Sequence, residues 1–350
     1  MVLYPTFGNW ISIDILNSLD SFALITMKEP WEILSPKVEK KPNILTFNQN
    51  MDIEHLENLA NTFNENFTIK NVVGLGGGTA CDTAKFLAWQ LGQSSNEQIN
   101  LYLIPSIISV DAFLCSSIAV REGGKVKYVG ESHPEEIIVD YDLIKEAPPY
   151  LNRAGVSDTI SITSALGDWK IAHEKMNEKF DQNIFNRAKH IVVDLMKHRE
   201  DIRDVSESGI RAIVDGFYKE VALCDEWGNA RPEEGSEHFF AYCLESITHQ
   251  HYIHGNLIGM AVLISLYLQE DYAEFEIDEL YQFFSDILIN ISPEFQGITE
   301  GNIETTLNSI KSYVLDEKLF YSVYNLDELT LNNDKLKEII NMLKKIKKKD

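Results

Sequence analysis

Short apolar runs alternate with amphipathic stretches over the first 150 residues of the chain. Five of the runs are rich in branched residues and have the length of a strand: residues 22–27, 43–48, 70–76, 99–106 and 136–140. Between the second and the third run, apolar side chains recur at helical spacing, at Ile53, Leu56, Leu59 and Phe63. Strands that alternate with helices predict a parallel sheet with helices on its faces.

The pattern changes after Pro148 and Pro149, and Gly155 adds a further break. Beyond this point the long segments lack the alternation of strands and favour helices, notably residues 188–200, 209–223, 239–250 and 257–269. We therefore expect an α/β domain over residues 1–154 and an all-helical domain over residues 155–350. A length of 350 residues is sufficient for two domains, each with its own core.

The formal net charge of -23 narrows the range of partners. It repels polyanions, so we expect neither nucleic acid nor an anionic membrane surface as a partner. A small anionic substrate stays compatible with this charge, because a few local positive groups can outweigh the overall field. The expected partner is therefore a small molecule.

The sequence carries no targeting signal that we recognise. Its first ten residues lack the basic flank and apolar stretch of a secretory signal, and the longest apolar segment, residues 257–268, is too short to span a bilayer. Both features predict a cytoplasmic protein. The four cysteines lie far apart and form no CxxC pair, so we expect neither a zinc knuckle nor a disulfide framework.

Three consecutive glycines, Gly76, Gly77 and Gly78, follow the third apolar run. Glycine permits positive φ angles and lets backbone N–H groups come close to a ligand. Thr79 is placed to cap the helix that we expect next, and the N-terminus of a helix favours an anion. A diphosphate site and a tight structural turn both fit these residues.

One carboxylate and two imidazoles of the second half form another candidate site, namely Asp158, His238 and His254. Such a set suits Zn²⁺ or Fe²⁺ with an open position for a substrate. The separations are long and the chain has 9 histidines, so the residue types alone do not single out this trio.

The glycine loop continues into the segment GGGTACDTAK, which ends at Lys85. This segment resembles the GGGSxxDxAK signature of the group-III, or iron-containing, metal-dependent alcohol dehydrogenases of the dehydroquinate synthase-like superfamily. The resemblance implies an α/β NAD(P)-binding domain followed by an all-helical domain that binds metal and substrate. It also implies that Gly76, Gly77, Gly78 and Thr79 hold the pyrophosphate of NAD or NADP.

The same resemblance selects the metal ligands. The family holds its metal with an Asp in a G-x-[GS]-D motif, a His in a later helix, and a His followed by Gly some sixteen to eighteen residues on. Asp158, His238 and His254 match these three positions. They are thus implied to bind Zn²⁺, with Fe²⁺ as the alternative, and Asp158 is implied to take part in catalysis, where the metal acts as a Lewis acid on the substrate hydroxyl.

Residues 104–129 resemble the PTxxSxDAxxSxLxV stretch that lines the nicotinamide and the substrate in this family. By position, Ser106, Ser109 and Cys115 are implied to contact the cofactor, and Asp111 to meet the substrate as a catalytic carboxylate. A structural Asp111 that caps the following turn is the alternative, because an Asp in an apolar stretch needs partners. Cys115 stands where the family usually has Ser.

Residues 134–172 and the SEH run that ends at His238 look most like glycerol-1-phosphate dehydrogenase, a branch of the family that reversibly reduces dihydroxyacetone phosphate. That branch usually has SEHxxxH, however, and here Tyr242 occupies the position of the second His. Residues 106–112 look closer to glycerol dehydrogenase. The alternatives to the first branch are therefore a glycerol or other polyol dehydrogenase, or a lyase or cyclase similar to dehydroquinate synthase.

The choice between NAD and NADP stays open. Lys28 and Glu29 follow the first predicted strand and offer one charge of each sign near the expected ribose position. Exposed helical domains often pack into dimers or larger rings, so we also expect a homo-oligomer.

Overall fold

The computed structural model describes residues 2–66, 69–95, 98–327, 329 and 331–346. The chain divides into two compact units, Met1–Asn152 and Arg153–Asp350. The sequence placed this boundary two residues later, after residue 154.

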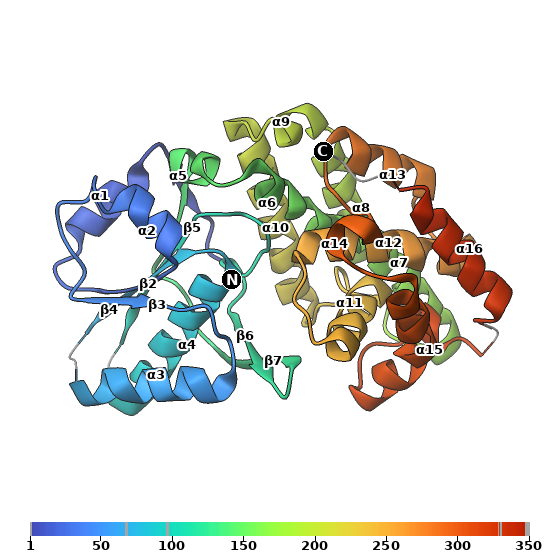
Figure 1. Ribbon diagram of the computed structural model, residues 1–350, viewed down its shortest axis with the longest axis horizontal. Coiled ribbons are helices and arrows are strands. Elements are labelled where there is room, and N and C mark those ends of the chain that lie inside the picture. The colour runs from blue at the N-terminus through green and yellow to red at the C-terminus, as the bar shows by residue number, and fades with distance from the viewer. Residues whose placement is uncertain (1, 67–68, 96–97, 328, 330, 347–350) are drawn as a thin grey trace. The chain divides into compact units, whose positions relative to one another are not determined.

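The first unit is built on a six-stranded sheet with the strand order β1-β8-β5-β4-β2-β3 (Figure 1). Every neighbouring pair in this sheet is parallel. The strands are β1 (Thr6–Gly8), β2 (Ala23–Thr26), β3 (Ile44–Phe47), β4 (Asn71–Gly76), β5 (Asn100–Pro105) and β8 (Glu136–Asp140). The helices of this part of the chain are α1 (Ile11–Ser18), α2 (Lys28–Leu34), α3 (Ile53–Asn66), α4 (Gly78–Ser95), α5 (Tyr141–Glu146) and α6 (Pro149–Ala154), which crosses the boundary.

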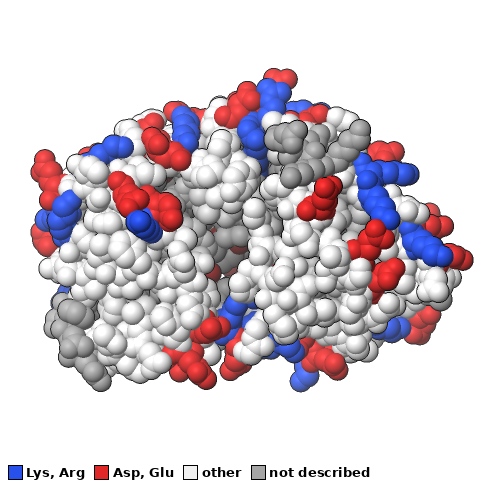
Figure 2. Space-filling model, in the orientation of Figure 1, with Lys and Arg blue, Asp and Glu red and all other residues white. Residues whose placement is uncertain are grey.

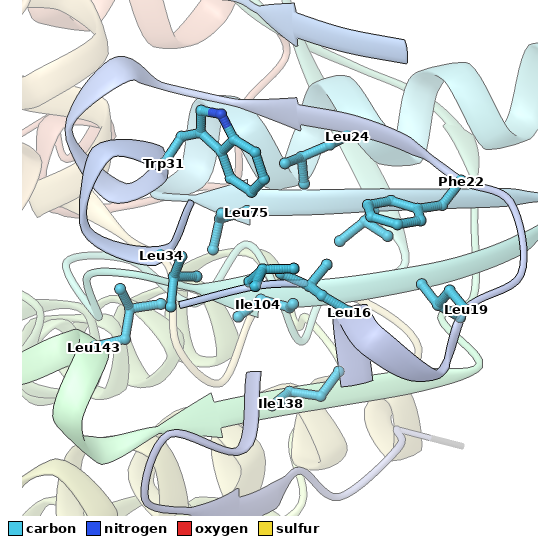
Figure 3. Close-up of a cluster of buried hydrophobic side chains, with 12 residues drawn as sticks. Leu16, Leu19, Phe22, Leu24, Trp31, Leu34, Leu75, Ile104, Ile138 and Leu143 are labelled. Carbon is cyan, nitrogen blue, oxygen red and sulfur yellow. The ribbon is translucent and has the colours of Figure 1, made fainter. Parts of the chain in front are cut away.

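Helices cover both faces of this sheet. Val73 and Leu75 of β4 belong to a buried cluster with side chains of α1, α2 and α5, such as Leu16, Trp31 and Leu143 (Figure 3). Gly74 lies between them in the strand, and a Cβ built on it would be 2.8 Å from the Cβ of Ala84 in α4. Because successive residues of a strand point to opposite faces, α4 packs on the face opposite the cluster.

The predicted α/β class of this unit is confirmed, since each of the five predicted runs forms a strand of the parallel sheet. Three strands were not predicted. β1 has only three residues, and β6 (Ser117–Glu122) and β7 (Lys125–Glu131) form a separate antiparallel hairpin. The hairpin turns at Gly123 and Gly124, whose φ angles are 60° and 79°.

The second unit is helical, and its described residues include no strand. Its helices are α7 (Val156–Met176), α8 (Gln182–Met196), α9 (Arg199–Arg203), α10 (Glu207–Trp227), α11 (Ser236–Thr248), α12 (His254–Gln269), α13 (Ile277–Asp286), α14 (Pro293–Gln296), α15 (Glu300–Asp316) and α16 (Asn333–Lys344), with short 3₁₀ turns η1 (Glu270–Tyr272) and η2 (Val323–Asn325). This confirms the predicted all-helical half.

Two of these helices are buried along nearly their whole length. α7 and α12 pack against each other, and both lack an exposed polar face. A helix that is buried all round belongs to the core of its domain. α7 and α12 therefore form the rigid centre of the second unit.

No helix in the described part of the chain is both long enough and apolar enough to cross a membrane. On the face drawn in Figure 2, Lys and Arg side chains lie scattered among Asp and Glu side chains, and that face has no broad basic area.

Candidate functional site

The glycine loop connects the end of β4 to the start of α4. Gly76 is the last residue of the strand and has a φ of 156°, a conformation that favours glycine. A Cβ on Gly76 would also lie 2.7 Å from the Cβ of Ala80. The loop is thus as tight as the sequence suggested, because the first turn of the helix folds back against the strand end.

Gly77 and Gly78 do not have positive φ angles. Glycine is required at both positions because no space is left there for a Cβ. A Cβ on Gly77 would be 2.8 Å from Ile107, and one on Gly78 would be 2.9 Å from Val110. Thr79 was predicted to cap the helix, and this prediction is wrong. The helix begins at Gly78, and the first N–H groups of the helix interior bond to the carbonyl of Gly77, so Thr79 lies in the first turn.

The predicted cofactor and substrate residues of the first unit lie on the strand end next to this loop. Ser106 is buried and its N–H donates to the carbonyl of Gly76 at 3.0 Å. Ser109, Asp111 and Cys115 are half-buried in the segment that follows β5. The Cys115 thiol donates to Oδ2 of Asp111 at 3.0 Å, and the Leu114 N–H donates to the Asp111 carbonyl at 2.7 Å.

This arrangement fits a dinucleotide. A crowded glycine loop leaves its backbone N–H groups at the N-terminus of α4, and a residue larger than glycine would fill the space there. Backbone N–H groups at a helix N-terminus bind phosphate. Gly76, Gly77, Gly78 and Thr79 could therefore hold a diphosphate.

The second unit brings the predicted metal ligands together. Asp158 lies in the first turn of α7, His238 in the first turn of α11, and His254 is the first residue of α12. One ligand atom from each residue lies within 4.8 Å of the others. Three helix starts thus converge, and they present one carboxylate oxygen and two imidazole nitrogens to a common point.

The state of Asp158 fits a bound cation. This side chain is buried, and within the described residues its Oδ1 atom has no hydrogen-bond partner. Nε2 of His254 is 3.2 Å away but lacks the geometry of a hydrogen bond. A buried carboxylate oxygen without a partner is costly, and a divalent ion between the three residues would remove that cost.

A second carboxylate orients one of the predicted ligands. Glu237 is fully buried, and its Oε1 atom lies 2.9 Å from Nδ1 of His238. Glu237 is itself held by the Ser164 hydroxyl and the Gly235 N–H, both at 2.6 Å. A hydrogen bond at Nδ1 leaves Nε2 as the ligand atom, as in many carboxylate, histidine and metal arrangements.

The sequence analysis missed this role of Glu237. His249 and His251 lie close to His254 in the sequence, but both are exposed and do not orient a ligand imidazole. The adjacent Glu237 and His238 were a usable signal, because a residue beside a ligand in the first turn of a helix can reach its ring. The sequence alone could not show that Glu237 is buried, and this burial keeps its side chain in place.

The charges around His238 also bear on its protonation. Burial alone lowers the pKa of this imidazole, but its hydrogen bond to Glu237 and the charges of Glu237, Glu234 and Asp158 outweigh burial and raise the pKa to about 9. A metal ion binds the deprotonated ring, so it must displace a proton below that pH.

The position after His254 requires a glycine for a steric reason. A Cβ on Gly255 would overlap the carbonyl oxygen of Ala154. Since Ala154 ends α6 and Asp158 follows within one turn of α7, this close approach brings the start of α12 to the Asp158 side chain. The His-Gly pair is therefore required by the packing that assembles the ligand set.

A further buried acid holds the loop before α11. Asp168 accepts the Ser236 N–H at 2.6 Å and the Val323 N–H at 2.7 Å. Burial, together with the negative charge of Glu237, raises the pKa of Asp168 to about 6. Asp168 ties α7 to the segment that carries Glu237 and His238.

Tyr242 stands one turn after His238 and takes part in the same surroundings. Its ring centroid lies 5.9 Å from that of His238, and its hydroxyl donates to the carboxylate of Glu234. Burial raises the pKa of Glu234, while the charges of His238 and His254 act in the opposite direction. An acidic group and a phenol therefore lie beside the ligand set.

Comparison with known proteins agrees with these features. Residues 29–148 match the family described as iron-containing alcohol dehydrogenase. A glycerol-1-phosphate dehydrogenase of Thermoplasma volcanium is 30% identical over 201 residues, which are 57% of this chain and 55% of that protein. The enzyme of the same name from Thermoplasma acidophilum is 27% identical over 242 residues, 69% of this chain and 65% of that protein. The matched segments thus span less than two thirds of these relatives.

Solved structures match over nearly the whole length. A probable glycerol dehydrogenase from Sinorhizobium meliloti has a TM-score of 0.71 at 17% identity, covering 98% of this chain and 96% of that one. An iron-containing alcohol dehydrogenase from Corynebacterium glutamicum has a TM-score of 0.70 at 13% identity, covering 99% and 95%. At this identity the structures establish the fold alone. Together the comparisons confirm the resemblance to the iron-containing alcohol dehydrogenases that the glycine loop indicated.

Proposed function

We propose that the protein is an NAD(P)-dependent, divalent-metal-dependent alcohol dehydrogenase. The observation that carries the proposal is the convergence of Asp158, His238 and His254, in which a buried Asp158 oxygen lacks a partner among the described residues. The crowded glycine loop of the first unit supports the dinucleotide half of the proposal.

Each set of residues has a role in the proposed reaction. A divalent ion, Zn²⁺ or Fe²⁺, would supply Lewis-acid stabilisation of the substrate oxygen, while a nicotinamide would supply or accept the hydride. Asp158, His238 and His254 would hold that ion, and Glu237 fixes the His238 ring. We propose that Asp111 relays the proton, because its Oδ2 atom already accepts a hydrogen bond from the Cys115 thiol.

The substrate we propose is dihydroxyacetone phosphate, reduced reversibly to glycerol 1-phosphate. The two Thermoplasma relatives bear the name of this activity. A Ser-Glu-His run with a buried, oriented Glu237 supports the same branch.

A second candidate is a dehydrogenase for glycerol or another unphosphorylated polyol. The observation in its favour is the Glu234 and Tyr242 pair beside the ligand set. With a divalent ion bound to Asp158, the carboxylates of Glu234 and Glu237 leave the surroundings of the ligands with no excess of positive charge. Such surroundings favour a neutral ketone over a phosphate ester.

One experiment separates these candidates. The purified protein, loaded with Zn²⁺ or Fe²⁺, is mixed with NADH or NADPH, and the loss of absorbance is followed with dihydroxyacetone phosphate and with dihydroxyacetone. Faster oxidation with the phosphate supports the first candidate, and faster oxidation with dihydroxyacetone supports the second. Absence of oxidation with both ketones, from a protein that binds metal and cofactor, would contradict both of these substrates and favour a lyase or cyclase, or a dehydrogenase for another carbonyl compound.

A further inference from the structure

The first unit contains a buried ammonium group that the proposed reaction does not use. Lys85 of α4 is fully buried. Its Nζ atom donates to three backbone carbonyl oxygens, those of Ala112 (2.9 Å), Cys115 (3.0 Å) and Ser117 (2.7 Å).

The Lys85 ammonium is also paired with a carboxylate. Oδ1 of Asp82, one turn earlier in α4, lies 2.7 Å from Nζ, and both side chains are almost entirely buried. Burial lowers the pKa of Lys85, but the Asp82 carboxylate outweighs burial and the pKa is raised. Lys85 is therefore charged, and its three N–H donors are shared among four acceptors.

The three carbonyls belong to one short stretch, which wraps around the ammonium. If no cation lay between them, these three buried carbonyl oxygens would face one another without a hydrogen-bond donor. That arrangement costs free energy. The shape of residues 112–117 therefore depends on Lys85. This stretch includes Cys115, and it begins next to Asp111, whose carboxylate accepts the Cys115 thiol.

The face of α4 that carries Lys85 also contacts the residue just before Asp111. Gly78, Asp82 and Lys85 are spaced by four and three residues, so they share one side of the helix. Gly78 abuts Val110 at the start of the helix, and Lys85 holds residues 112–117 two turns further on. A single helix thus carries the glycine loop and fixes both sides of Asp111.

We propose that Lys85, with Asp82, is a positioning residue that sets the place of Asp111 and Cys115 relative to the glycine loop. The pair acts through the backbone and touches neither substrate nor cofactor. The expected change in kcat rests on the proposed function, whereas the expected change at Cys115 does not.

The test compares Lys85→Met, Asp82→Asn and the double variant. Lys85→Met removes the charge at similar side-chain length, whereas Asp82→Asn leaves the ammonium and its three carbonyl contacts. The matched control is an exposed pair of the same unit, Lys40 and Asp20, whose atoms are 3.5 Å apart and which is changed to Met and Asn in the same way.

The kinetic readout is the split between cofactor binding and turnover. A displaced reactive group costs about 10²-fold in rate, so we expect kcat to fall by about that factor in Lys85→Met, while the dissociation constant of NADH changes little. Asp82→Asn should lower kcat less, because the carbonyl contacts remain. The Lys40 and Asp20 variants should keep the parent kcat. If NADH affinity and kcat fell by the same factor, and both followed a fall in the melting temperature, the result would contradict a positioning role.

The second readout does not depend on turnover. The rate at which iodoacetamide alkylates Cys115 is measured in a Cys224→Ser background, where the two remaining cysteines, Cys81 and Cys243, are buried. We expect Lys85→Met to change this rate by at least severalfold, because it alters both the position of Cys115 and the charge beside its thiol. Asp82→Asn should change the rate less, since the carbonyl contacts remain, and the control pair should leave it unchanged. If Lys85→Met does not fold, Asp82→Asn decides alone. Parent rates of alkylation in the folded variants would overturn the inference, whether or not the wild-type protein reduces a ketone.

Discussion

Two clusters of ionisable side chains, one in each unit, differ in whether their buried polar atoms have partners. In the first unit, Lys85 and Asp82 satisfy each other, and the remaining donors of Lys85 go to backbone carbonyls. In the second unit, Asp158 and His254 approach to 3.2 Å without a hydrogen bond.

The difference separates a structural role from a binding role. Buried charge is tolerated where its hydrogen bonds are complete, as they are around Lys85. Around Asp158 the backbone and neighbouring side chains leave one oxygen uncompensated among the described residues. The first cluster can hold the chain in shape by itself, whereas the second would be completed by the cation that we propose there. The following predictions test that contrast.

The largest effect is expected from removing a proposed ligand. Asp158→Ala or His254→Ala should abolish stoichiometric binding of Zn²⁺ and, since Lewis-acid stabilisation is worth several kcal/mol, lower turnover by about 10³-fold. NAD should still bind with nearly the parent affinity. Metal content by elemental analysis and NADH fluorescence measure the two outcomes. His251→Ala is the control, because this imidazole is exposed, and normal metal content in Asp158→Ala would refute the ligand assignment.

The next effect is the pH dependence of metal binding. The pKa of His238 is raised from 6.5 to about 9, and a metal ion must displace this proton. Between pH 7 and 9 the apparent affinity for Zn²⁺ should rise about tenfold per pH unit and then level off. Titration against a chelator of known pH dependence measures the slope, and a flat profile over this range would mean that His238 is already neutral at pH 7.

The same raised pKa has a consequence for the metal-free protein. A protonated His238 interacts with Glu237, so its contribution to the free energy of unfolding is fully present below pH 6.5 and is lost as the pH rises through about 9. Urea unfolding of the metal-free protein across this range gives the sign independently of any metal titration.

A smaller effect is expected from the group that orients His238. Glu237→Gln keeps the size of the side chain and can still accept from the Gly235 N–H, but it loses the charge at Nδ1 of His238. Loss of such an orienting partner typically lowers metal affinity by about 10- to 100-fold. Competition with a chelator at fixed pH measures it. Glu245→Gln is a suitable comparison on the same helix, and unchanged affinity in Glu237→Gln would remove Glu237 from the site.

Sequence and structure agree best where a local pattern determines the outcome. The five predicted strands and the helical second half follow from apolar periodicity, which reports burial on one or both faces. β1 was not predicted because a three-residue strand has no period. The β6–β7 hairpin was not predicted because only Ile118 and Val120 of its strands are buried, too few for an apolar run. The cap assigned to Thr79 failed for a related reason, since Gly77 already supplies the first carbonyl of α4.

The candidate site was predictable only through motifs. Asp158, His238 and His254 lie far apart in the sequence, and only the resemblance selected them from other acids and histidines. Glu237 and Lys85 were quoted within motifs, yet their contacts depend on burial and on distant carbonyls that no spacing encodes. The reason for Gly255, its approach to Ala154, is likewise a property of packing.

The smallest effect is expected at the glycine loop, where the proposed ligand contacts come from the backbone and no side chain can be deleted. Gly77→Val instead adds atoms 2.8 Å from Ile107, which must move or push the loop outward. Displacing one charge-assisted hydrogen bond costs about 1.5 kcal/mol, so the dissociation constant of NADH should rise about tenfold with metal binding unchanged. Gly301→Val is the control, because the nearest atom to its Cβ is 3.8 Å away. Unchanged cofactor affinity in a folded Gly77→Val would reduce the loop to a structural turn, and a loss of metal binding instead would show that the two clusters are not independent.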